Sequence, residues 1–263
     1  LYDEVSRMAQ ALADAGVVRG DRVAGFMPNM PQTMIAMLAA VSLGAIWSSS
    51  SPDFGIKGVL DRFGQIEPKV LITADGYFYN GKSFDSLDRV GGIVQQLPRV
   101  EKVVVVSYVS DKPDLSRVPN AVSWNSFVAP YSPTAIDFEQ VPADHPLYVM
   151  YSSGTTGKPK CMVQSHAGIL VNQLKEHLLH CNLQRSDVLF YFTTCGWMMW
   201  NWLVCGLGAG ATLVLYDGSP FHPGPEVLWK LAEELGITIF GTSAKYISSL
   251  ADAGYKPGED CDL

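Results

Sequence analysis

The order in which strand-like and helix-like segments follow one another is the feature of this sequence that most limits its fold. Short apolar runs alternate with segments of helical period along most of the 263 residues. The runs predicted as strands cover residues 23–26, 44–47, 70–73, 103–106, 147–150, 188–192, 212–216 and 237–240. Strands that alternate with helices form parallel sheets with helices packed on them. We therefore predict an α/β fold with doubly wound, mostly parallel sheets flanked by helices.

Helices are predicted between most of these strands. They cover residues 1–16, 31–43, 53–66, 87–97, 167–180, 225–235 and 245–253. Residues 107–144 contain five prolines and are predicted to form an irregular connection with short elements. The chain is expected to be one domain over 1–263, with 1–143 and 144–263 as possible lobes.

Composition and charge exclude several classes of protein. Because 48% of the residues are hydrophobic and 17% are charged, the chain can bury a sizeable core and is not disordered. A formal net charge of −7, without any basic run, argues against nucleic acid as a partner. The five cysteines are scattered and include no Cys-x-x-Cys pair, so we expect neither a disulfide framework nor a metal site. Small molecules are the expected partners.

Residues 191–216 carry no charged side chain and have the length of a membrane span. Polar residues and four glycines divide this stretch into a strand, a loop, a short helix and another strand. A buried parallel strand is also a nearly continuous apolar run. We therefore predict no membrane span and expect a cytoplasmic protein in the cytosol.

A segment rich in glycine and hydroxyl groups follows the strand predicted over residues 147–150. From residue 151 to residue 160 it has the sequence Tyr-Ser-Ser-Gly-Thr-Thr-Gly-Lys-Pro-Lys. Glycine lets backbone N–H groups approach phosphate oxygens, and hydroxyl and lysine side chains add donors and positive charge. The spacing differs from that of a Walker-type phosphate loop. The segment is predicted to wrap a polyphosphate, and a solvated turn is the alternative.

The ordered string over residues 151–160 resembles the signature loop of the AMP-forming acyl-CoA synthetases, which belong to the adenylate-forming superfamily. In that family the loop grips the β- and γ-phosphates of ATP while a carboxylate attacks the α-phosphate. The resemblance implies ATP, Mg²⁺ and CoA as cofactors, with Thr156 and Lys160 as catalytic residues. The residues implied to contact the ATP phosphates are Ser152, Ser153, Gly154, Thr155, Thr156, Gly157 and Lys160.

A cluster of tryptophan and methionine residues is the second candidate site. Residues 193–202 read Thr-Thr-Cys-Gly-Trp-Met-Met-Trp-Asn-Trp and follow a predicted strand, where α/β sheets place ligands. Packing in the core is the alternative. In the resembled family a Gly-Trp pair introduces the acyl pocket, which implies that Trp197, Met198 and Met199 contact the carboxylate substrate.

Four segments show a more specific resemblance within this family, and they cover residues 45–49, 51–55, 196–204 and 215–220. These resemble the members of the family that activate acetoacetate. The implied function is that of an acid–thiol ligase, which joins acetoacetate to AMP and then to CoA. Another short-chain acid, such as acetate or propionate, is the main alternative.

The same resemblance points to three further residues. His166 stands where many members of the family have a histidine after the loop, and it is either a substrate-side contact or a packed or capping histidine. Lys82 matches a basic segment that contacts CoA, although Tyr79 stands where the family has an arginine. Ser243 matches the wall of the tunnel for the pantetheine arm of CoA.

The family continues with segments that bind adenine and ribose, a hinge and a C-terminal domain that carries the adenylation lysine. None of them is recognised before Leu263, so the chain is expected to be an incomplete N-terminal domain that is inactive alone. Two other functions remain open: a catalytically silent nucleotide-binding module and a structural remnant that binds nothing.

Overall fold

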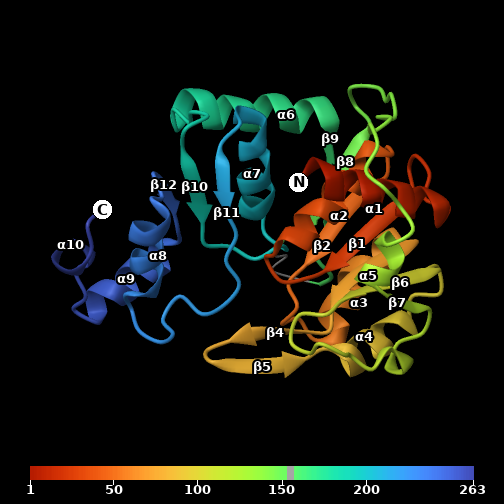
Figure 1. Ribbon diagram of the computed structural model, residues 1–263, viewed down its shortest axis with the longest axis horizontal. Helices are drawn as coiled ribbons and strands as arrows, with labels where there is room; N and C mark the ends of the chain where they lie inside the picture. Colours follow the sequence, from red (N-terminus) through yellow and green to blue (C-terminus); the bar gives the residue numbers. More distant parts are fainter. Residues whose placement is uncertain (153–156) are drawn as a thin grey trace.

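The computed structural model describes residues 1–152 and 157–263 (Figure 1). Its larger sheet has seven strands, of which all neighbours are parallel except the last pair. In spatial order these strands are β7 (Ala121–Ser123), β6 (Lys102–Val106), β3 (Val70–Ala74), β1 (Arg22–Phe26), β2 (Ile46–Ser50), β8 (Pro146–Tyr151) and β9 (Cys161–Ser165).

Helices cover both faces of this sheet. One face packs against α1 (Tyr2–Asp14), α2 (Pro31–Ser42) and α5 (Trp124–Val128), and the other packs against α3 (Ile56–Ile66) and α4 (Leu87–Val94). The four consecutive valines of β6 show why: Val104 and Val106 point to the first face, while Val103 and Val105 point to the second. A strand buried on both faces must be apolar throughout. The predicted doubly wound α/β fold is confirmed.

A smaller sheet of three parallel strands lies beside the first. It places β10 (Val188–Tyr191) between β11 (Thr212–Val214) and β12 (Ile239–Gly241). Its helices are α6 (His166–Lys175), which continues as a π-helical turn over Glu176–His180, α7 (Met198–Cys205), α8 (Val227–Leu235), α9 (Ala244–Asp252) and α10 (Pro257–Asp260). On β10, Leu189 packs with Leu203 of α7, whereas Phe190 packs with Leu228 of α8 and Leu250 of α9. Side chains on the two faces of β10 therefore pack into two separate small hydrophobic cores.

The sequence did not predict a two-stranded antiparallel hairpin that projects from the larger sheet (Figure 1). It consists of β4 (Gly76–Tyr79) and β5 (Lys82–Asp85), joined by Asn80 and Gly81. Both turn residues have positive φ, 53° and 75° respectively. Two-residue turns of this kind favour Asn-Gly because both positions adopt the left-handed region. The dipeptide was thus a usable signal for the hairpin.

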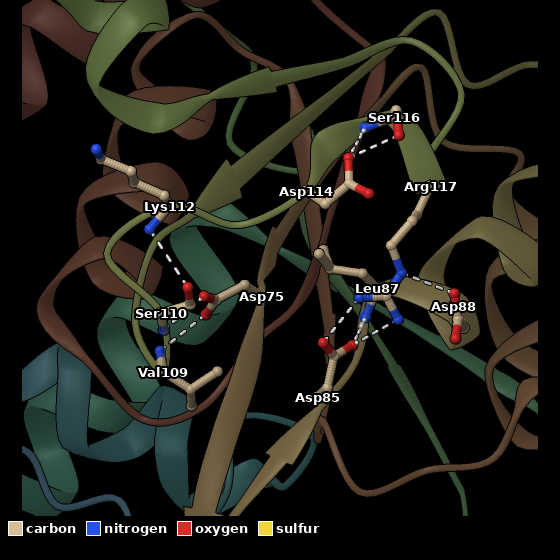
Figure 2. A network of polar contacts seen from close by, with 10 residues as sticks. All are labelled: Asp75, Asp85, Leu87, Asp88, Val109, Ser110, Lys112, Asp114, Ser116 and Arg117. Carbon is tan, nitrogen blue, oxygen red and sulfur yellow. Dashed lines mark hydrogen bonds and ion pairs between the residues drawn. The ribbon is translucent and has the colours of Figure 1, made fainter.

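The hairpin and the loop that follows β6 are tied to the sheet by two groups of polar contacts (Figure 2). The carboxylate of Asp75, which is 1% exposed, accepts hydrogen bonds from the backbone N–H groups of Tyr108, Val109 and Ser110 at 2.8, 2.9 and 2.9 Å. Arg117 forms a two-pronged contact with Asp85, at 2.8 and 3.0 Å, and a further bond to Asp88 at 2.8 Å. Such paired contacts fix geometry as well as adding energy.

Other predicted boundaries differ from the structure. Residues 48–50 continue β2 instead of turning, and β7 and β9 were not predicted. Both β8 and β9 follow residue 144 yet belong to the larger sheet, so the chain passes from one sheet to the other between Ser165 and Val188. The organisation as one domain over residues 1–263, with 1–143 and 144–263 as possible lobes, stays a prediction.

All five cysteines lie in the described residues and are free. None of the helices in the described part of the chain combines the length and the apolar composition that crossing a bilayer requires.

Candidate active site

The parallel strands of the larger sheet all end at one edge, and a segment of the smaller sheet is fastened onto that edge. Trp200 donates from Nε1 to Asn29 Oδ1 at 2.9 Å, just beyond β1. Ser49 Oγ donates to the backbone carbonyl of Cys195 at 2.6 Å, near the end of β2. The carboxyl edge of open parallel sheets is where ligands bind. The contacts therefore place residues 195–200 at the expected position for a site.

The predicted phosphate loop begins at the same edge, because β8 runs parallel to β2. It joins β8 to the antiparallel strand β9, with Tyr151 opposite Cys161. Its base is closed by two hydrogen bonds: the Ser152 N–H donates to the Lys160 carbonyl at 3.0 Å, and the Lys160 N–H donates to Ser152 Oγ at 3.2 Å. The Ser152 hydroxyl accepts in this contact, so its own O–H can still donate to a ligand.

Four of the predicted phosphate contacts, Ser153, Gly154, Thr155 and Thr156, lie outside the described residues. Beyond them, Gly157 has a φ of 93°, a value that favours glycine. The carbonyl of Pro159 accepts a hydrogen bond from Gln65 of α3 at 2.8 Å, which supports this arm of the loop.

The two lysines of the loop differ in their surroundings. Lys158 lies close enough to Asp61 to add to the lowering of its pKa, which is caused first by a hydrogen bond from Lys57. Lys160 is exposed, and across the residues that the structure describes no carboxylate is within ion-pair distance of it. Its ammonium group is therefore available to an anionic ligand.

The residues implied for the acyl pocket lie at the start of α7. Trp197 is 63% exposed and Met198 is 38% exposed, whereas Met199 packs against the core of the smaller sheet with Trp202. Gln173 of α6 donates to Met198 Sδ at 3.9 Å and to the hydroxyl of Tyr148 in β8 at 3.2 Å. Gln173 thus links Met198 to the strand from which the phosphate loop starts, whereas Trp197 is exposed and Met199 packs towards the core.

A cavity of about 320 Å³ lies between the two sheets at this edge. Its walls come from residues that follow strand ends and from the hairpin: Met27–Asn29, Ser51–Asp53, Tyr77–Tyr79, Phe84, Phe192–Thr194 and Tyr216–Gly218. Of these residues, the sequence placed only Thr193 and Thr194 in a candidate site. Two of its segments of finer resemblance, 51–55 and 215–220, nevertheless contribute to the walls. A search for polar residues just after each predicted strand would have added Asn29, but not the apolar residues Met27, Pro28 and Phe192.

Asp217 is an acidic group in the wall of this cavity. Its Oδ2 accepts a hydrogen bond from the Tyr108 hydroxyl at 3.2 Å. Burial raises the pKa of Asp217, and the hydrogen bonds from Tyr108 and from the Phe78 backbone partly oppose this. Burial also raises the pKa of Tyr108, with a further contribution from the Asp217 charge. Tyr108 therefore remains the donor of this bond across the physiological range.

His166 does not lie with the other predicted site residues. Because β9 runs antiparallel to β8, with Ser165 opposite Pro146, His166 lies at the amino end of β8. It lines a separate, mostly apolar cavity of about 430 Å³, and its ring is 5.7 Å from that of His145. Burial and then the neighbouring His145 lower the pKa of His166. The structure places it as a packed residue at the start of α6.

Of the two residues implied to contact CoA, Lys82 lies beside the cavity, whereas Ser243 caps a helix next to the smaller sheet. Lys82 is exposed at the start of β5, directly after the hairpin turn, and its cross-strand partner Tyr79 lines the cavity. Ser243 follows β12 and is the N-cap of α9, where its side chain accepts a hydrogen bond from the Tyr246 N–H at 3.2 Å. Neither side chain lines the cavity itself.

We expect the Ser243→Ala variant to lower the free energy of unfolding of the chain by about 1 kcal/mol, because the N-cap bond of α9 is lost. Ser243→Asp, which keeps an accepting oxygen at the cap, should retain most of the stability. Denaturant-induced unfolding of the two variants measures the difference. Equal stability of Ser243→Ala and the parent chain would show that the cap bond does not contribute to the free energy of unfolding.

Comparison with known proteins supports a family assignment. A family model described as AMP-binding enzyme matches residues 1–261. Acetoacetyl-CoA synthetase from Mus musculus is 50% identical over 100% of the chain, and acetoacetyl-coenzyme A synthetase from Rhizobium meliloti (strain 1021) is 52% identical over 98% of it. The structure of acetoacetyl-CoA synthetase from Streptomyces lividans superposes with a TM-score of 0.93 over 99% of the chain, at 46% identity.

The chain spans 40% of the length of the mouse and Rhizobium proteins and 39% of the Streptomyces chain. Within that span the match is nearly continuous, since the family model leaves only residues 262 and 263 unmatched. The chain therefore belongs to the family of AMP-binding enzymes.

Proposed function

We propose that the whole gene product is an acid–thiol ligase that converts acetoacetate, ATP and CoA into acetoacetyl-CoA, AMP and diphosphate through an acetoacetyl-adenylate. The observation that carries the proposal is the identity of about 50% to proteins named acetoacetyl-CoA synthetases across the entire chain. We assign the reaction to the cytosol, where thiols such as the five free cysteines remain reduced.

In the first half-reaction a carboxylate must meet ATP, and both are anions. Positive charge and aligned donors near the phosphates lower the cost of that encounter, provided that they are held in place beforehand. The closed base of the loop supports this role, as does the ammonium group of Lys160, which has no carboxylate within ion-pair distance among the described residues. We assign phosphate contacts to Ser152, Ser153, Gly154, Thr155, Thr156, Gly157 and Lys160, with Thr156 and Lys160 acting on the reacting phosphate.

Magnesium enters this scheme with the nucleotide. Among the described residues there is no group of three or more His, Cys, Asp or Glu side chains that could hold a metal ion. Mg²⁺ prefers phosphate oxygens and water together with only one or two carboxylates. We therefore write Mg·ATP as the substrate and assign no resident metal site to this part of the chain.

The acid and CoA approach from different sides. Trp197 and Met198 form the exposed wall for the acid, and Met199 supports them from the core. For the second half-reaction we assign the pantetheine arm of CoA to the cavity between the sheets, with Lys82 and Ser243 at its margins. That arm is narrow and uncharged, which suits a cavity lined by aromatic rings and the carboxyl groups of Asp53 and Asp217.

The test is a substrate panel on the whole gene product. Acetoacetate, acetate, propionate and butyrate are each supplied with Mg·ATP, and acid-dependent diphosphate release and acyl-adenylate are measured before CoA is added. Acetoacetate should give the highest kcat/KM. Adenylate formation from acetate or propionate but not from acetoacetate would assign another acid. ATP binding without any adenylate would identify a silent nucleotide-binding module.

A further inference from the structure

Asp217 lines the cavity between the sheets and accepts a hydrogen bond from Tyr108, which lies behind the cavity wall. We propose that Tyr108 and Asp217 are positioning residues, which hold the hairpin wall and the opposite wall at the separation that admits the CoA arm. This inference rests on the proposed function, because it concerns the ligand of the second half-reaction.

The two residues come from different halves of the molecule. Tyr108 follows β6 of the larger sheet, whereas Asp217 follows β11 of the smaller sheet. Their hydrogen bond of 3.2 Å therefore joins the two halves. The backbone of Phe78, in the hairpin, lies close enough to Asp217 to lower the pKa of its carboxyl group. One carboxyl group thus contacts both the loop after β6 and the hairpin.

Tyr108 is itself held in place from two directions. Its ring meets the ring of Phe78 edge-on, with centroids 5.2 Å apart and an interplanar angle of 79°. Its backbone N–H donates to the buried carboxylate of Asp75, which also accepts from Val109 and Ser110. Figure 2 shows the bonds from Val109 and Ser110. A residue whose backbone and ring are both fixed presents its hydroxyl in one direction, as a positioning contact requires.

The segment that carries Asp217 is also ordered by its own contacts. The hydroxyl of Tyr216 donates to the carbonyl of Ser219 at 2.9 Å, and the Phe221 N–H donates to Ser219 Oγ at 3.3 Å. These bonds order the segment, and the hydrogen bond from Tyr108 fixes Asp217 relative to the loop that follows β6. Hydrogen bonds at Pro28, Asn29 and Ser49 also join the two halves, near the ends of β1 and β2.

The Tyr108→Phe variant of the whole gene product tests the proposal, because it removes the donor and keeps the ring against Phe78. We expect the KM for CoA to rise roughly threefold to tenfold, the loss that corresponds to one hydrogen bond. Acetoacetate-dependent exchange between ATP and diphosphate should be unchanged, because that half-reaction does not use CoA. Asp217→Ala should behave like Tyr108→Phe, and Asp217→Asn, which keeps an acceptor for the tyrosine, should recover most of the affinity.

Tyr131→Phe is the matched control. It also removes a hydrogen bond from a tyrosine hydroxyl to an aspartate, since Tyr131 donates to Asp14 at 2.8 Å, and neither residue lines the cavity. This variant should leave the KM for CoA unchanged. Loss of exchange and of CoA-dependent turnover by the same factor in Tyr108→Phe would mean a purely structural contact and would overturn the proposal. An unchanged KM would overturn it as well.

Calorimetric titration of the same proteins with CoA separates this proposal from the proposed function. The titration needs no turnover, so it reports on the cavity even if acetoacetate is not the substrate. Weaker CoA binding by Tyr108→Phe, with normal binding by Tyr131→Phe, supports the positioning role whatever acid is used. Absence of CoA binding by the parent protein contradicts it.

Discussion

Replacing Lys160 by alanine in the whole gene product is expected to slow formation of the acyl-adenylate roughly tenfold to a thousandfold, the range lost when one electrostatic donor is removed from a preorganised site. The reason is the position of the lysine at the base of the loop, where its backbone is fixed by Ser152 and its ammonium has no carboxylate partner among the described residues. Acetoacetate-dependent release of diphosphate measures the effect.

Lys158→Ala is the control for this experiment. Lys158 carries the same charge two residues earlier, but it lies towards Asp61 on α3. Its loss removes a positive charge from the loop without removing the group at the base, so we expect a much smaller change in the same rate. Equal losses in the two variants would show that only the total charge of the loop matters. An unchanged rate in Lys160→Ala would refute its catalytic role.

Replacing Asp75 by alanine is expected to lower the free energy of unfolding of the chain by about 3 kcal/mol, because three backbone N–H groups lose the buried carboxylate that accepts their hydrogen bonds. These donors belong to Tyr108, Val109 and Ser110, and the carboxylate that serves them is buried. Few single polar residues in the structure satisfy so many donors. Denaturant-induced unfolding of the chain, followed by circular dichroism, measures the loss.

Asp75→Asn separates the hydrogen bonds from the volume of the side chain. Oδ1 accepts from Tyr108 and Val109, whereas Oδ2 accepts from Ser110. An amide can keep its oxygen at the first position, but its NH₂ group then faces the Ser110 N–H. We expect Asp75→Asn to lose less stability than Asp75→Ala, and comparable losses would contradict the importance of the paired contact.

The fold class could be predicted because the residues of a single strand indicate whether one or both of its faces are buried. The valines at residues 103–106 are apolar on every position, as a strand covered on both faces requires. The sequence of an individual strand does not predict which strands lie next to it in the sheet. The antiparallel direction of β9 was missed for the same reason, since it follows from pairing with β8 and not from a local pattern.

The candidate site was predictable only where its residues are neighbours in sequence. The ten residues from Tyr151 to Lys160 form a recognisable string, and the structure closes that string at its base. The cavity instead combines residues as distant in sequence as Pro28 and Asp217, because segments that follow strands of both sheets line it. No pattern of residue spacing along the sequence predicts that such distant residues line the same cavity. His166 shows the opposite case, because it is close to the loop in sequence but lies at the far end of β8.

The shared direction of the parallel strands has a consequence for how such a protein can change. Every segment that follows β1, β2, β10 or β11 contributes to the cavity, while the strands themselves form the core. Substitutions in these connecting segments can alter which molecule is recognised with little loss of stability of the fold. Substitutions in the strands instead destabilise the core that supports the cavity, whatever ligand it binds. Selectivity and robustness can therefore evolve along largely independent routes in this molecule.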